Sequence, residues 1–185
     1  KSIRKKAGKY LITFNQCWDQ VVAGCKAQHG ANCWLYDPLV ESYTAIHQAG
    51  CQQQPHSDSA KEQQNKKDGP FLASVVCNNT KHQSPVRLHS VELWAVGKTK
   101  TKTSETDDNN VDVTNNNADS EPRLVAGELG YTVGAIYTSL TGYTNESSAG
   151  SVQMAALGAA LRQASFKVWD LGMDMEYKRD FGSSL

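Results

Sequence analysis

The sequence RLVAGELGYTVGAIYTSLTGY, at residues 123–143, decides the fold of this chain. Glycines divide the stretch into short segments filled with β-branched and aromatic residues, the residue types that strands prefer. The pattern predicts two strands, at about residues 124–131 and 132–139. The sequence Thr-Gly-Tyr-Thr at 141–144 then breaks the pattern, and we expect the second strand to end before it.

A helix and a third strand are expected directly after this stretch. Residues 148–164 place their apolar side chains at helical spacing. Residues 166–171 form a short apolar segment that carries one carboxylate, Asp170, and we expect a buried strand there. Judged from these residues alone, this part of the chain is an α/β unit with a site near its strand ends.

The N-terminal half adds shorter elements. Alternation predicts a strand at residues 10–14, and the next segment predicts a helix over about residues 15–26, capped by its first residue, an asparagine. An Asp-Pro pair is a typical helix start and predicts a second helix over about residues 37–49. A further strand is expected at about residues 86–96.

The length of 185 residues and an apolar content of 39% fit one domain of ordinary size. We predict a single domain over residues 1–185 with two polar inserts, at about 52–85 and 98–122. Both inserts are poor in apolar residues, which gives them little surface to bury against the entropy of ordering. Within them, we expect residues 55–68 and 100–120 to be mobile.

The five cysteines form no C-x-x-C pair and no metal-ligand spacing, and we interpret them as reduced thiols of a cytoplasmic protein. His47 and Cys51 are four residues apart, which favours a helix end over a metal pair. No Cys–His nucleophile pair is evident, and no metal site is expected. No apolar run approaches the ~18 residues that a membrane span requires.

Positive charge is concentrated at the start of the chain although the formal net charge is zero. Arg4, Lys5 and Lys6 lie in this basic segment, residues 1–9. Contact with RNA phosphates would use such residues, because Lys and Arg release counterions when they bind nucleic acid. A solvated terminus fits the same composition.

Four motifs occur in one order along the chain: SIRKKAGKYLITFNQCWDQVVAGC, LVESYTAIHQAG, HSVELW, and a C-terminal series from LVAG to KVWD. In this order they resemble leucyl/phenylalanyl-tRNA–protein transferase, over most of residues 2–50 and 89–182. The resemblance implies an α+β fold of the acyl-CoA N-acyltransferase (GNAT) type, with a mixed, mainly antiparallel sheet flanked by helices. The N-terminal domain usual in that family has no counterpart in these residues.

The resemblance implies a reaction that needs no metal or cofactor, with aminoacyl-tRNA as the co-substrate. The α-amine of a protein or peptide N-terminus attacks the ester that joins an amino acid to tRNA. This modification marks proteins for degradation by the N-degron pathway. The implied partners are aminoacyl-tRNA and protein N-termini, and the protein is expected to be a monomer.

The resemblance also implies the site residues. Asp170 stands where the family has an aspartate near the reacting ester, which makes it the candidate catalytic residue. Trp94 stands where the family has a tryptophan that stacks on the terminal adenosine. The pocket for the aminoacyl side chain maps onto Glu128, Tyr137, Met154, Leu161 and Trp169. Ordinary core packing is the alternative for the last four and for Trp94, and a buried structural acid is the alternative for Asp170.

Two departures from the family pattern favour other functions. The family glutamate that contacts the reacting amine is Leu140 here, and its glutamine after the aspartate is Gly172. Glu146 is a candidate replacement from the neighbouring loop. One alternative is a non-catalytic relative that binds tRNA or N-termini. Another is an N-acetyltransferase, but no pyrophosphate-binding loop precedes the helix at 148–164.

Glu128 occupies a position that is apolar in the family pocket, which selects leucine or phenylalanine. A buried carboxylate is costly unless it is paired, and arginine would supply two parallel hydrogen bonds. We therefore hypothesise that the transferred residue is basic. The competing explanation is a strand register that points Glu128 to solvent.

Overall fold

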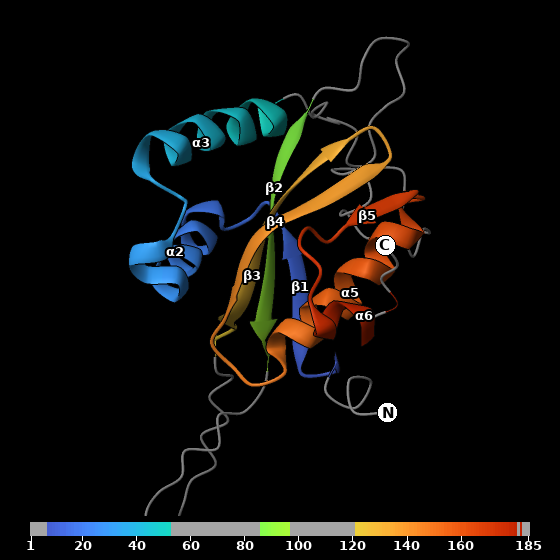
Figure 1. Cartoon of the computed structure of the whole chain (residues 1–185). Helices are drawn as coiled ribbons and strands as arrows, with labels where there is room; N and C mark the ends of the chain where they lie inside the picture. Colours follow the sequence, from blue (N-terminus) through green and yellow to red (C-terminus); the bar gives the residue numbers. More distant parts are fainter. Residues whose placement is uncertain (1–6, 53–85, 97–120, 181, 183–185) are drawn as a thin grey trace, which may run out of the picture.

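The computed structural model describes residues 7–52, 86–96, 121–180 and 182 (Figure 1). The elements in chain order are β1 (Tyr10–Phe14), α2 (Trp18–His29), the short 3-10 helix η1 (Gly30–Asn32), α3 (Asp37–Gln52), β2 (Arg87–Ala95), β3 (Arg123–Val133), β4 (Ile136–Thr144), α5 (Ala149–Gln163), β5 (Val168–Asp170) and α6 (Glu176–Asp180). The segments expected to be mobile, 55–68 and 100–120, lie outside the described residues.

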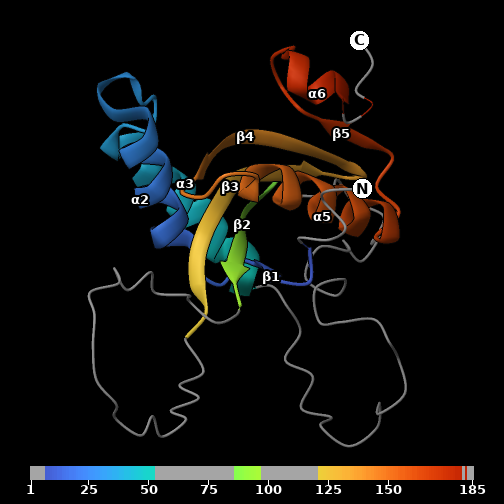
Figure 2. The ribbon, with the colours of Figure 1, turned by 90° about the horizontal axis from the view of Figure 1, so that it is seen from below.

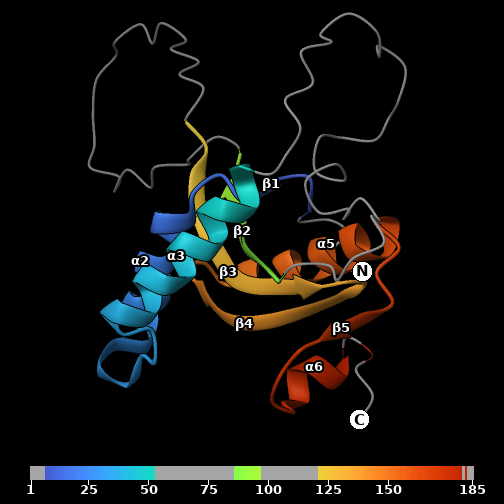
Figure 3. The same ribbon diagram turned by 90° about the horizontal axis from the view of Figure 1, so that it is seen from above.

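One curled sheet joins the five strands in the order β1-β2-β3-β4-β5 (Figures 2 and 3). Neighbouring strands are antiparallel except for β4 and β5, which are parallel. A parallel pair requires a crossover, which α5 supplies between these two strands. The expected α+β class and the mixed, mainly antiparallel sheet are confirmed.

Helices cover both faces of this sheet. On one face α2 packs against β3 and β4 and α3 packs against β2, whereas α5 packs on the other face (Figure 1). The predicted apolar face of α2 is confirmed, since its buried residues are Trp18, Val21, Val22 and Cys25. Burying this face removes apolar surface from water, which stabilises the fold by about 25 cal/mol for each Å² buried.

The contact between α2 and the sheet depends on two glycines that flank Tyr143. A Cβ atom at Gly24 would lie 2.5 Å from the Tyr143 ring, and one at Gly127 would lie 2.6 Å from it. Any larger residue would therefore displace the ring. These glycines allow Tyr143 of β4 to fill the space between helix and sheet, where it is 6% exposed.

Three strand predictions are wrong in detail. The second strand was expected to end before Thr141, but β4 continues to Thr144. The turn between β3 and β4 lies at Gly134-Ala135 instead of between Tyr131 and Thr132. Gly134 has a φ of 58°, a left-handed conformation that glycine adopts without steric cost. The expected buried strand at 166–171 is only the short edge strand β5, in which Val168 is 50% exposed. An apolar sequence did not distinguish an edge strand from a central one.

The start of α2 also differs from the expected helix over residues 15–26. Asn15 has a φ of 59°, which excludes it from a right-handed helix, and the helix begins at Trp18. None of the described helices is both long and apolar enough to cross a membrane. Cys17, Cys25, Cys33 and Cys51 are free thiols.

Candidate functional site

Glu128 lies on the central strand β3 and is 8% exposed. Its Oε1 accepts hydrogen bonds from the Tyr137 hydroxyl at 3.1 Å and from Ser139 Oγ at 2.6 Å. Ser139 Oγ in turn accepts a hydrogen bond from Trp169 Nε1 at 3.0 Å. These four side chains, which we call the Glu128 site, connect β3, β4 and β5.

The pairing of β3 with β4 explains how these side chains meet. Tyr137 and Ser139 are two residues apart and therefore project from the same face of β4. The strand register shifts beside Ser139, where β3 residues Leu129 and Gly130 pair with Thr141 and Ser139. The irregularity leaves Leu140 as an extra residue of β4, which is how a β-bulge redirects neighbouring side chains.

Apolar residues surround the Glu128 site on the face covered by α5. Tyr137 and Leu161 belong to one buried cluster, and Trp169 packs against it. Trp169 comes close to α5 at Gly158, where a Cβ atom would lie 2.9 Å from Trp169 Cζ3. Four of the residues predicted to form one pocket therefore lie together: Glu128, Tyr137, Leu161 and Trp169.

Burial raises the pKa of the Glu128 carboxyl to about 7, because the charged form is poorly solvated there. The hydrogen bonds from Ser139 and Tyr137 and the ammonium of Lys178 act in the opposite direction. Lys178 is held by the carbonyl oxygens of Leu171 and Met173. A carboxyl with this pKa exchanges its proton near neutral pH.

Two acceptors at this face, of which only one is buried, have no hydrogen-bond donor within the described part of the chain. Both hydrogen bonds to Glu128 are accepted by Oε1, and none reaches Oε2. Gln153 is 4% exposed, and its Oε1 is buried without a partner. Gln153 lies on α5 one turn before Leu157, which belongs to the same buried cluster as Tyr137. The site is thus richer in acceptors than in donors.

The structure corrects the competing explanation for Glu128. Its side chain is inside the fold, so a register that points it to solvent is wrong. Ser139 is the member of the site that sequence reasoning did not select. Its two-residue spacing from Tyr137 on one strand was the available signal.

Asp170 lies at the exposed end of β5, and its Oδ1 accepts a hydrogen bond from the Gly172 backbone N–H at 2.8 Å. The idea of a buried structural acid is therefore wrong, although the backbone hydrogen bond is present. Trp169 and Asp170 are adjacent in a strand and project from opposite faces. Asp170 is not brought into the Glu128 site.

Trp94 and Met154 also lie outside the Glu128 site. Trp94 Nε1 donates a hydrogen bond to Thr13 Oγ1 at 2.8 Å, and Thr13 Oγ1 in turn donates to Glu92. These side chains lie on the sheet face that α2 covers. Met154 is half-buried on α5 and is not among the cluster residues. Arg4, Lys5 and Lys6 lie outside the described residues.

A second buried carboxylate, Glu92 of β2, was not predicted. It is fully buried and accepts hydrogen bonds from four groups: Thr13 Oγ1, Ser90 Oγ and the backbone N–H groups of Gln16 and Cys17. These donors tie β1 and the start of α2 to β2. Because both carboxylate oxygens accept hydrogen bonds, we assign Glu92 a structural role.

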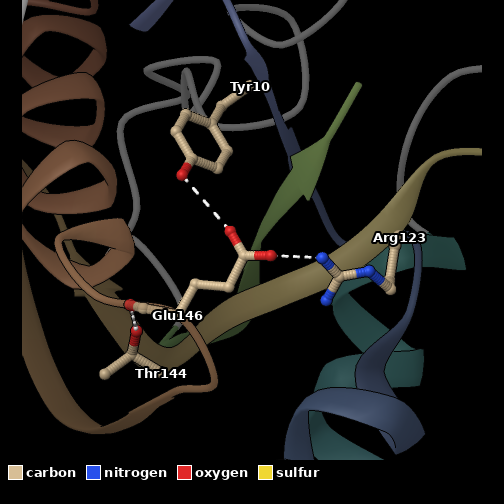
Figure 4. A network of polar contacts seen from close by, with 4 residues as sticks. All are labelled: Tyr10, Arg123, Thr144 and Glu146. Carbon is tan, nitrogen blue, oxygen red and sulfur yellow. Dashed lines mark hydrogen bonds and ion pairs between the residues drawn. The ribbon is translucent and has the colours of Figure 1, made fainter. Parts of the chain in front are cut away.

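Glu146, the candidate replacement from the loop, lies outside the Glu128 site. It forms an ion pair with Arg123 and accepts a hydrogen bond from the Tyr10 hydroxyl at 3.3 Å (Figure 4). These contacts hold it beyond the end of β4, on the loop that leads to α5. Leu140 itself packs against the core between the sheet and α2. Neither Glu146 nor Leu140 therefore brings a second carboxylate to the Glu128 site.

One cysteine lies next to a histidine, a contact that sequence reasoning did not select. Cys51 Sγ lies 3.8 Å from His47 Nε2 in the last turn of α3. Within the described ranges, no group of three or more His, Cys, Asp or Glu residues is arranged to hold a metal ion. No known family model matches the chain.

Proposed function

We propose that this chain is an aminoacyltransferase with a GNAT-like fold, which transfers an amino acid from aminoacyl-tRNA to the N-terminal amine of a protein. One observation carries the proposal. Glu128, Tyr137, Leu161 and Trp169, which the resemblance assigns to one pocket, come from three strands and a helix and lie together. The mixed sheet with a β4–α5–β5 crossover supports the same fold interpretation.

The reaction needs little from the protein beyond positioning. The amine nitrogen forms a bond with the ester carbon, the bond from that carbon to the tRNA oxygen breaks, and this oxygen receives the proton. The ester is already activated, so orientation supplies much of the barrier reduction, up to ~7–11 kcal/mol in ideal cases.

The transferred residue that best fits the Glu128 site is basic. Glu128 Oε2 and Gln153 Oε1 are acceptors without donors in the described chain, and a guanidinium carries five N–H donors. Arginine would stabilise the carboxylate and lower the pKa that burial has raised to about 7. A leucine side chain would leave the buried Gln153 Oε1 unpaired, at about 1–3 kcal/mol.

Glu128→Met tests this specificity. The unmodified protein is expected to transfer arginine from arginyl-tRNA to N-terminal peptides, and Glu128→Met should abolish this transfer and admit leucine. The control is Glu41→Gln, because Glu41 is exposed on α3, away from the site. Efficient leucyl transfer by the unmodified protein, with no response to Glu128→Met, would contradict the assignment.

Asp170→Asn tests the predicted catalytic residue. The amide is nearly isosteric and still offers an oxygen to the Gly172 N–H, but it holds no negative charge. We expect turnover to fall ~100-fold or more, the lower end of the range for loss of an acid–base group, while the melting temperature stays within a few degrees. Equal losses of activity and stability would assign Asp170 a structural role.

A second candidate function is tRNA or N-terminus binding without catalysis. Two observations favour it: Leu140 is packed into the core, and Gly172 offers only its backbone N–H, to Asp170. Incubation with labelled aminoacyl-tRNAs and a peptide panel separates the two functions. Tight binding of aminoacyl-tRNA without any transferred label would establish the second one.

A further inference from the structure

The last turn of α3 brings a thiol, an imidazole and a guanidinium together, away from the Glu128 site. Cys51 is exposed and its Sγ lies 3.8 Å from His47 Nε2. Arg87 of β2 passes beside this turn, since a Cβ atom at Gly50 would lie 3.8 Å from Arg87 Cγ. The Nε of Arg87 is buried and has no hydrogen-bond partner among the described residues.

The orientation of His47 follows from its second ring nitrogen. Nδ1 lies 3.0 Å from the carbonyl oxygen of Leu88, which only accepts, so Nδ1 carries the proton. In the neutral imidazole, Nε2 is then the acceptor, and it faces the Cys51 thiol. The Cys51 thiol, the His47 imidazole and the Leu88 carbonyl therefore stand as nucleophile, base and orienting group. This arrangement activates a nucleophile.

The imidazole is also held by packing. His47 is 6% exposed, and its ring stacks on Trp18 at 4.3 Å between centroids and 14° between planes. Trp18 is fixed in turn by a hydrogen bond from its Nε1 to Thr44 Oγ1 at 2.9 Å. The base therefore stays in place while the exposed thiol remains open to reagents.

We propose that Cys51 is a site of thiol–disulfide exchange with small disulfides, in which His47 is the general base. Cys51 Sγ attacks one sulfur of the disulfide, and His47 Nε2 takes the thiol proton. A new Sγ–S bond forms, the S–S bond of the reagent breaks, and the departing thiolate receives the proton from His47. Cys51 is thereby oxidised to a mixed disulfide, and half of the reagent is reduced to a thiol.

The charge environment agrees with base assistance rather than a preformed thiolate. Burial raises the pKa of the Cys51 thiol, and Arg87 lowers it. The thiol therefore starts neutral, and Arg87 stabilises the negative charge that develops on sulfur during attack.

The other described cysteines lack this arrangement. Cys25 is buried, and burial raises its pKa to about 12. The pKa of Cys17 is raised by burial and by Glu92. Cys33 has the backbone carbonyl of Cys25 as its neighbour instead of an imidazole.

Residue-resolved labelling of the full chain with oxidised glutathione, read by peptide mass spectrometry, tests the proposal. Native Cys51 is expected to react faster than Cys17 and Cys33 and faster than Cys51 in the urea-unfolded chain. His47→Gln should slow the reaction of Cys51 about 100-fold or more, the lower end of the usual range for loss of a general base. The matched control His29→Gln, at the end of α2, should leave the rate unchanged.

Two results would overturn the proposal. One is an unchanged Cys51 rate in a folded His47→Gln protein. The other is a native Cys51 rate no higher than that of the unfolded chain, a measurement that decides the matter even if His47→Gln fails to fold.

Discussion

Glu128 and Glu92 are two buried carboxylates on neighbouring strands, and they differ in what surrounds them. Glu92 accepts hydrogen bonds from four groups, two of them backbone N–H groups at the start of α2. Glu128 accepts from two hydroxyl groups, and burial raises its pKa to about 7. A buried polar group that is only partly paired is a property of binding sites more than of cores.

The raised pKa of Glu128 makes the stability of the free protein depend on pH. The folded protein retains this proton up to about pH 7, whereas the unfolded chain loses it near 4.5. The stabilisation is therefore complete below pH 4.5 and is lost as the pH rises through 7, by up to roughly 3 kcal/mol. Urea unfolding of Glu128→Gln should show a smaller decline over this window than the unmodified protein.

The control for this measurement is Glu41→Gln, which changes an exposed carboxylate of α3. It should keep the decline of the unmodified protein. Parallel pH profiles of the Glu128→Gln and unmodified proteins would show that Glu128 ionises normally in the folded chain.

At the scale of elements, α5 and β5 are held together where Trp169 meets Gly158. A Cβ atom at Gly158 would lie 2.9 Å from the ring, whereas one at Gly150 of the same helix would meet nothing closer than 3.8 Å. Displacing Trp169 would also disturb its hydrogen bond to Ser139. The packing of this helix therefore positions the Glu128 site.

Alanine at these two glycines should have opposite effects. Gly150→Ala is expected to stabilise by about 0.5–1 kcal/mol, because alanine has the higher helix propensity. Gly158→Ala should instead destabilise by about 1–3 kcal/mol, because overpacking outweighs the propensity gain. Urea midpoints at one pH measure both. An equal stabilisation by the two substitutions would show that Trp169 moves at no cost.

At the scale of the whole molecule, the formal net charge is zero while the first residues are basic. Replacing Arg4, Lys5 and Lys6 with alanine should weaken tRNA binding and flatten its salt dependence. The slope of log K against log salt should fall by about 0.7–0.9 for each lost phosphate contact. The control removes the exposed charges Arg162 and Lys167 instead. Equal slopes in all three proteins would make the basic segment a solvated terminus.

The sequence by itself determined most of the elements. Periodicity correctly placed α5, the buried face of α2 and the strands at β1 and β2. It misplaced the turn after β3, because Thr132 and Val133 suit either strand of the hairpin. It also made β5 a buried strand, because composition does not reveal which strand forms the edge.

Only the tertiary structure decided the site. Strand alternation shows that Glu128 and Leu129 project from opposite faces, but helices cover both faces of β3, so either residue can be buried. The bulge at Leu140 then brings Ser139 to Glu128. The pairing of Cys51 with His47 likewise depends on the Leu88 carbonyl of β2, which fixes the imidazole. Contacts between segments that are distant in the sequence determine where these side chains point, and the local sequence does not predict those contacts.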